Sequence, residues 1–97
     1  MIRSFFDQGT EDVFNGTDSR PARRACPVEI WRVAQRKLDR LNDARELRDL
    51  VSPPGNRLES LAGERAGQHS IRINEQYRIC FVWTSSGPER VEVTDYH

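Results

Sequence analysis

The sequence predicts an α+β fold in which an N-terminal helical hairpin packs on a mostly antiparallel sheet of about four strands. A helical pattern of apolar residues runs through residues 27–42, and short segments with alternating apolar residues follow between residues 68 and 94. Proline- and glycine-containing turns separate these segments. A chain of 97 residues has room for one hydrophobic core, so residues 1–97 are expected to form a single domain.

The first quarter of the chain is expected to contain a strand, a helix and a loop. Residues 2–6 favour a short strand, and residues 7–14 favour a short helix that stops at Gly16. Residues 17–24 are polar and basic, which indicates a solvated loop.

The helical pattern is strongest from Pro27 to Asn42. Proline suits the first turn of a helix, and apolar side chains recur at spacings of three and four: Val28, Trp31, Ala34, Leu38 and Leu41. Residues 43–46 resemble a capping box and predict a second short helix that ends before the Pro-Pro-Gly of residues 53–55. So short a connection would make the two helices an antiparallel hairpin.

The second half of the chain contains four strand candidates, at residues 57–61, 68–74, 77–83 and 90–94. Successive side chains of a strand point to opposite faces of the sheet. We therefore expect the helices to cover an apolar face formed by Ile71, Ile73, Ile79, Phe81 and Trp83. The opposite face would carry Arg72, Asn74 and Arg78, and it is where a ligand is expected to bind.

Composition excludes several classes of protein. The net charge is zero, which argues against a protein that coats nucleic acid by bulk charge. No apolar run is long enough to span a bilayer, and Asp7 interrupts any signal peptide, so a cytoplasmic location without membrane contact is expected. The two cysteines, Cys26 and Cys80, are then expected to be reduced and structural. Fourteen of the fifteen basic residues are arginine, which suits phosphate binding, although a GC-rich genome would have the same effect.

The chain ends in Asp95, Tyr96 and His97, directly after the last predicted strand. Metal-free cleavage of RNA needs a base for the 2′-hydroxyl, an acid for the leaving oxygen and a cation for the phosphate. These three side chains can move protons, and histidine does so near neutral pH. On spacing alone, a solvated chain end remains the favoured interpretation.

Four segments resemble the RelE/HigB family of toxins. They are GNRLE at residues 55–59, AGERAGQHSIRIN at 62–74, QYRICF at 76–81, and the closing DYH at 95–97. The opening MIRSF and the helix pair also fit, so the resemblance covers nearly the whole chain, and the ordered succession of these motifs is specific.

The resemblance implies a compact α+β endoribonuclease that enters the ribosomal A site and cleaves messenger RNA without a metal or other cofactor. It also implies an antitoxin partner, which in the HigB branch is a helix-turn-helix DNA-binding protein. The toxin–antitoxin complex of such systems represses its own operon, so operator DNA would be contacted only through that complex.

The resemblance also assigns residues by position. Asp95, Tyr96 and His97 match the terminal acid/base cluster of the family, and Arg78 matches the arginine that holds the scissile phosphate. We expect the last strand to bring this cluster beside Arg78. The further residues expected to bind RNA are Arg57, Arg65, Arg72 and Asn74.

Two positions depart from the family pattern. Ala62 and Glu59 stand where some relatives have a lysine and a histidine. A missing charge-stabilising or acid–base group typically costs about 10²- to 10⁴-fold in rate, so a slow enzyme is expected. The alternative is a toxin-fold binding module that acts mainly through its antitoxin and operon autoregulation. A metal-dependent hydrolase that uses His69, His97 and Asp95 is disfavoured, because their spacing is not that of metal ligands; His69 is expected to be a packed side chain.

Overall fold

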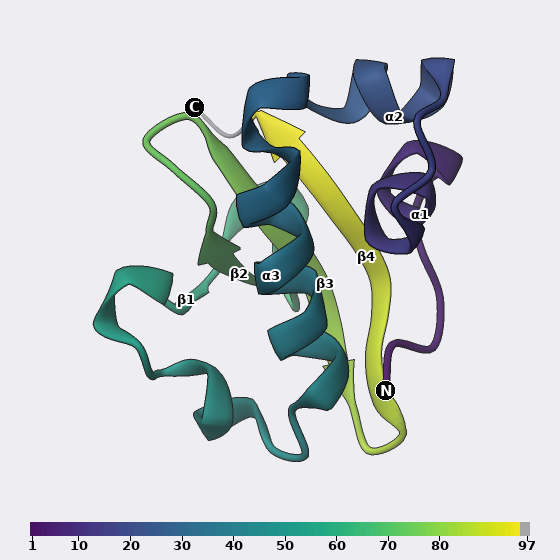
Figure 1. Ribbon diagram of the computed structural model, residues 1–97. Coiled ribbons are helices and arrows are strands. Elements are labelled where there is room, and N and C mark those ends of the chain that lie inside the picture. Colours follow the sequence, from purple (N-terminus) through teal and green to yellow (C-terminus); the bar gives the residue numbers. More distant parts are fainter. Residues whose placement is uncertain (96–97) are drawn as a thin grey trace.

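The strands form one antiparallel sheet in the order β1-β2-β3-β4 (Figure 1). In the computed structural model, which describes residues 1–95, the strands are β1 (Glu59–Ser60), β2 (His69–Arg72), β3 (Tyr77–Thr84) and β4 (Gly87–Asp95). Each strand follows its neighbour in the chain, as expected where short turns join the strands. The predicted α+β class and the four predicted strands are confirmed, with β1 shorter than expected.

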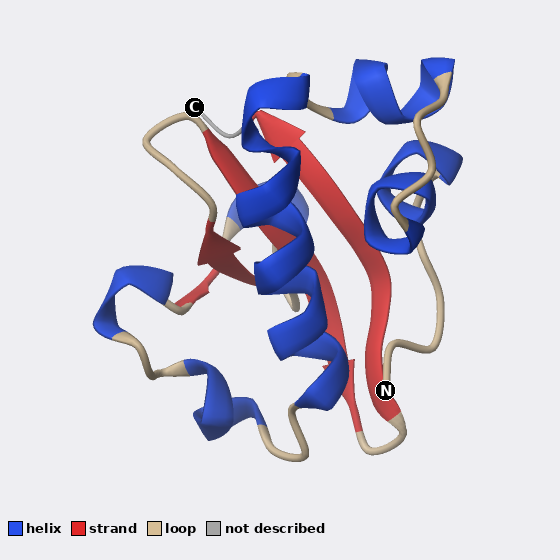
Figure 2. Ribbon diagram, in the orientation of Figure 1, coloured by secondary structure: helices blue, strands red, loops and turns tan. Residues whose placement is uncertain are grey.

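Three α-helices lie on one face of this sheet: α1 (Gln8–Asn15), α2 (Arg20–Ala25) and α3 (Trp31–Asp43). Figure 2 shows α3 crossing the face of the sheet, with α1 and α2 beside β4. A 3₁₀ turn, Val28–Ile30, leads into α3, so the predicted helix begins slightly late. Leu38 and Leu41 are fully buried in one core with Ile71, Ile79 and Phe81, as the apolar pattern predicted.

Hydrogen bonds fix α1 at its start and against β4. The Asp7 carboxylate accepts a hydrogen bond from the Thr10 amide at 2.8 Å, which caps the first turn. Gly16 ends the helix with a φ of 74°, a left-handed conformation that glycine adopts readily. The Thr10 hydroxyl accepts a hydrogen bond from the Val93 amide at 2.9 Å, so α1 is tied directly to the last strand.

The prediction of a loop at residues 17–24 was wrong, because α2 occupies most of this segment. The Ser19 hydroxyl caps the helix by accepting a hydrogen bond from the Ala22 amide at 3.1 Å, and Pro21 lies in its first turn. The helix packs closely on α1: a Cβ atom at Gly9 would collide with the Pro21 carbonyl oxygen. Packing on α1 thus compensates for a segment whose own apolar content is low.

Two further expectations hold only in part. The second arm of the predicted hairpin is a single 3₁₀ turn, Leu47–Leu50, and its capping box joins Glu46 and Asp49 rather than residues 43 and 46. Ala44 is extended and ends α3, so the box forms three residues later than expected. The predicted strand at residues 2–6 makes one parallel bridge, from Phe5 to Val91, and is otherwise irregular.

Asn56 holds the segment that leads into β1. Its side chain is fully buried and donates hydrogen bonds to the carbonyl oxygens of Leu50 at 3.1 Å and Ser52 at 3.2 Å. Its side-chain oxygen accepts a hydrogen bond from the Lys37 ammonium group of α3. Because buried polar groups are costly when unpaired, this network fixes the backbone immediately before Arg57.

Both cysteines are buried and unbridged, as expected. Burial raises the pKa of Cys26 to about 11 and also raises the pKa of Cys80, so both thiols stay protonated at neutral pH. Within residues 1–95, no helix combines the length and the apolar character needed to cross a membrane.

Candidate functional site

The face of the sheet opposite the helices carries polar side chains. Arg72 pairs with Arg78 across β2 and β3, and Arg78 pairs with Thr94 across β3 and β4. Ile71 and Ile79, one residue away on each strand, lie in the core. Since side chains alternate along a strand, Arg72 and Arg78 point away from the core, as the sequence predicted.

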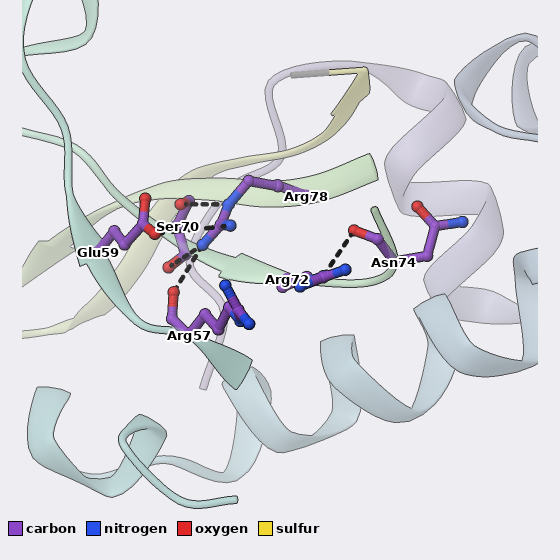
Figure 3. A network of polar contacts seen from close by, with 6 residues as sticks. All are labelled: Arg57, Glu59, Ser70, Arg72, Asn74 and Arg78. Carbon is purple, nitrogen blue, oxygen red and sulfur yellow. Dashed lines mark hydrogen bonds and ion pairs between the residues drawn. The ribbon is translucent and has the colours of Figure 1, made fainter. Parts of the chain in front are cut away.

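Arg78 is the most firmly held cation on this face (Figure 3). Only 9% of the residue is exposed. Its Nε donates a hydrogen bond to the Ser70 hydroxyl at 2.7 Å, and its Nη2 donates one to the Arg57 carbonyl oxygen at 2.6 Å. These contacts join Arg78 to two other segments of the chain and fix the plane of the guanidinium group, which is the preorganisation that electrostatic catalysis requires.

Two residues missed by the sequence analysis as site residues contribute to this arrangement. Ser70 is fully buried on β2 and orients Arg78. Glu59 pairs with Ser70 across β1 and β2, and its Oε1 lies 4.0 Å from Nη1 of Arg78, with the side chain 53% exposed. The result is a guanidinium with one nitrogen facing an accessible carboxylate, a pairing that can hold a phosphate and accept a proton beside it.

Three of the four predicted RNA-binding residues, Arg57, Arg72 and Asn74, lie around Arg78. Arg57 has a left-handed backbone, with a φ of 44°, and an exposed side chain beside the Arg78 network. Arg72 donates a hydrogen bond from Nε to the Asn74 carbonyl oxygen at 3.1 Å. The Asn74 side chain accepts hydrogen bonds from the amides of Gln76 and Tyr77, so it builds the β2–β3 turn.

Arg65 lies on the same face, further along the sheet, and is paired. Its Nη1 donates hydrogen bonds to the Gln68 side chain at 3.0 Å and to Glu92 at 3.2 Å. The Arg65 and Glu92 side chains are 30% and 16% exposed, so solvent screens this ion pair only in part. Glu92 thus offsets the charge of Arg65, which lowers its attraction for a phosphate.

Asp95 is not brought beside Arg78. The register pairs Asp95 with Tyr77 and Thr94 with Arg78, so Asp95 lies on the helix-covered side of the sheet. There it borders a pocket with Tyr77 and residues of α1 and α2, and it accepts a hydrogen bond from the Gln76 side chain at 2.8 Å. Tyr96 and His97, the other two residues of the predicted cluster, lie outside the described residues.

His69 packs against the core, as expected. Its ring stacks on Phe81 with the centroids 6.3 Å apart, and it pairs with Phe81 across β2 and β3. Asp95 pairs with Tyr77, which is four residues from Phe81 on β3. His69 and Asp95 are therefore about 13 Å apart along the sheet, which is too far for one metal ion to bind both. In the described part of the chain, no three side chains of His, Cys, Asp or Glu gather as metal ligands do.

We predict that His69→Phe stabilises the protein. Nδ1 of His69 is buried and has no hydrogen-bond partner among residues 1–95, so phenylalanine would remove an unpaired polar atom while keeping the ring on Phe81. The free energy of unfolding should rise by about 1 kcal/mol in urea denaturation. His69→Asn, which keeps a polar group but loses the ring, should destabilise the protein; a less stable His69→Phe variant would mean that Nδ1 is satisfied.

Comparisons with known proteins agree with this fold. Residues 3–97 match the family model described as the RelE-like toxin of the type II toxin–antitoxin system HigB. Toxin HigB-1 of Vibrio cholerae serotype O1 is 41% identical over 83 residues, which cover 86% of this chain and 84% of the relative. An uncharacterised protein of Haemophilus influenzae is 37% identical over 60 residues, which cover 62% of this chain and 59% of that protein.

A solved structure, the YoeB–YefM complex from Staphylococcus aureus, contains a chain with the same fold. It superposes with a TM-score of 0.61 over 100% of this chain and 98% of that chain, at 12% sequence identity. This likeness shows the fold alone, whereas the family model and the Vibrio cholerae relative both span most of the sequence. The chain therefore belongs to the HigB family of RelE-like toxins of type II toxin–antitoxin systems.

Proposed function

We propose that this toxin is a ribosome-dependent endoribonuclease that cleaves messenger RNA in the A site without a metal or other cofactor. The observation that carries the proposal is the fixed guanidinium of Arg78, which is held by Ser70 and the Arg57 carbonyl and has Nη1 facing Glu59. A preorganised cation beside a carboxylate supplies two of the three groups that such a cleavage needs.

In the proposed mechanism, Nη1 of Arg78 binds a non-bridging oxygen of the scissile phosphate. Glu59 takes the proton of the adjacent 2′-hydroxyl, and the 2′-oxygen attacks phosphorus to form a 2′,3′-cyclic phosphate. The P–O bond to the 5′-oxygen breaks, and His97 donates the proton that this oxygen requires. Tyr96 stacks on a neighbouring base, and Asp95 acts from the helix-covered side as a positioning residue for the terminal cluster.

Glu59 stands where some relatives have a histidine, and in this mechanism it acts as the base. A carboxylate is a weaker base near neutral pH than the histidine of some relatives, and Ala62 brings no charge. Both features support a slow enzyme.

The remaining expected residues contact RNA on the same face. Arg57, Arg72 and Asn74 lie on either side of Arg78, and Arg65 lies further along the sheet. Because the net charge of the chain is zero, this local cluster of arginines provides the attraction for the backbone phosphates. Arginine also suits the task, since its planar fork holds phosphate through two hydrogen bonds.

We further propose that residues 1–97 form one cytoplasmic toxin domain that contacts no membrane and is neutralised by a helix-turn-helix antitoxin. Operator DNA would then be bound only through the toxin–antitoxin complex. Membership of a type II toxin–antitoxin family supports a protein antitoxin.

Cleavage of messenger RNA by the purified toxin, with analysis of the new ends, tests the proposed chemistry. On translating ribosomes, we expect cuts that leave a 5′-hydroxyl and a 2′,3′-cyclic phosphate. A 2′-deoxynucleotide placed before the scissile phosphate should block the cut, because it removes the nucleophile. Products that end in a 3′-hydroxyl, or unimpeded cleavage of the deoxy-substituted message, would exclude this mechanism.

The second candidate function is a binding module that retains the fold and acts through its antitoxin. Arg78 is 9% exposed and Arg65 is paired with Glu92, and both features limit access of phosphate to the cations. Expression of the chain without an antitoxin separates the two functions. The nuclease should stop growth and fragment messages, whereas a binding module should leave both unaffected.

A further inference from the structure

A small hollow lies on the same face of the sheet as Arg78. Its volume is about 240 Å³, and its lining residues are Phe6, Glu64, Arg65, Gln68, Arg90 and Glu92.

 Glu92 pairs with Cys80, which is two residues after Arg78 on β3, so the hollow begins about 7 Å from Arg78 along the sheet.

Phe6 forms an exposed aromatic wall of this hollow. The Phe5 ring packs into the core against Phe14, with the centroids 5.6 Å apart, whereas the Phe6 side chain is 55% exposed. The Phe6 amide donates a hydrogen bond to the Val91 carbonyl oxygen at 2.9 Å, which holds Phe6 beside β4. An aromatic ring left half open on a polar face is a ready stacking surface.

The polar lining offers both donors and acceptors but no net charge. Arg65 and Arg90 carry two positive charges, and Glu64 and Glu92 carry two negative ones. Arg65 is held by Gln68 and Glu92, while the Arg90 side chain has no hydrogen-bond or ion-pair partner within residues 1–95. A neutral hollow of this kind does not favour a phosphate; it suits a neutral planar group with hydrogen-bonding edges.

We propose that this hollow binds one nucleobase of the RNA whose backbone passes Arg78, with the base stacked on Phe6 and its edge facing the Arg65–Glu92 pair. The proposal rests on the proposed function and adds a specificity site to it. The volume of the hollow is below the range of pockets for drug-sized ligands, which fits a single base rather than a whole nucleotide. A carboxylate accepts hydrogen bonds from donors on the edge of a base, and a guanidinium donates hydrogen bonds to acceptors there.

Binding of short, uncleavable RNA tests this proposal without requiring nuclease activity. The probes are the four homotrinucleotides with 2′-O-methyl groups, titrated to millimolar concentration and followed by the NMR signals of the Phe6 ring and the Arg65 side chain. Phe6→Ala should weaken binding about 5- to 150-fold, the usual effect of removing a stacking ring. Phe6→Tyr should retain the affinity, and Phe6→Leu should not, because leucine keeps apolar area but has no ring.

Val51→Ala is the matched control, since Val51 is 59% exposed and lies outside the hollow. All variants should unfold at the same denaturant midpoint as the unmodified chain. Trinucleotide binding that does not depend on Phe6, or no binding at all, would overturn the proposal. A Phe6→Ala variant that keeps its affinity for RNA but no longer binds its antitoxin would also overturn the proposal, because the hollow would then be a protein-docking site.

The outcomes for this site and for the nuclease are separable. Phe6-dependent binding by a chain that cuts no message would retain the base site and reject the proposed function. Cleavage whose codon preference is unchanged in Phe6→Ala, together with Phe6-independent binding, would retain the nuclease and reject the base site.

Discussion

Arg78→Ala is expected to reduce single-turnover cleavage of ribosome-bound messenger RNA by about 10²- to 10³-fold, the usual cost of removing one group that stabilises charge in the transition state. Arg78 is the cation with the most restricted geometry on the polar face, because Ser70 and the Arg57 carbonyl hold two of its nitrogens. Quantitative primer extension on a defined message measures the loss.

Control variants separate the loss of the Arg78 charge from a loss of stability. Alanine would leave the Ser70 hydroxyl without its buried donor, so the variant is also expected to lose stability. Arg78→Lys retains the charge without the planar fork and should recover only part of the rate. Arg32→Ala, at an exposed position of α3, should change neither rate nor stability. Full activity in a folded Arg78→Ala variant would contradict the proposed phosphate site.

The sequence pattern was sufficient to predict the sheet and its polar face. Alternation in residues 68–74 separates Ile71 and Ile73 from Arg72, and the structure buries the first two while Arg72 points away from the core. Strand alternation is a local property of the chain, so it can be read without knowing which strands pair. The helical period of residues 27–42 is local in the same way, and α3 follows it.

Local patterns failed where packing between segments decides the structure. Residues 20–25 have little apolar content and were expected to form a loop, yet they form α2 against α1. A signal was present, because Ser19 and Pro21 are typical of a helix N-terminus. The shift of the capping box from residues 43–46 to Glu46 and Asp49 depends on the extended backbone of Ala44, which nothing in the local sequence requires.

The position of Asp95 relative to Arg78 could have been predicted from alternation. Asp95 has the same parity as Val91 and Val93, whose side chains are buried beneath the helices. Its placement with Tyr77, away from Arg78, follows from that pattern. The proximity of Glu59 to Arg78 could not be predicted in this way, because it depends on the pairing of two strands that a loop separates.

Glu59→Gln is expected to reduce the cleavage rate by about 10²- to 10⁴-fold, because the amide cannot accept the 2′-hydroxyl proton that the proposed mechanism assigns to Glu59. The substitution preserves size at a side chain that is 53% exposed, so stability should be little changed. Glu59→His should restore part of the rate, with activity that rises with pH through the histidine range as the imidazole loses its proton. Ser60→Ala, at the neighbouring exposed position of β1, is the matched control.

The sign of the Glu59→Gln effect decides between two roles of this carboxylate. Glu59 lies 4.0 Å from Nη1 of Arg78, where it can accept a proton from the substrate or compete with the phosphate for the guanidinium. A general base makes the glutamine variant slower and gives the histidine variant a new pH dependence. A competitor makes the glutamine variant bind RNA more tightly and cleave at least as fast. A faster Glu59→Gln enzyme would therefore assign proton abstraction to another residue. Glu59 would then be a group that weakens phosphate binding to Arg78.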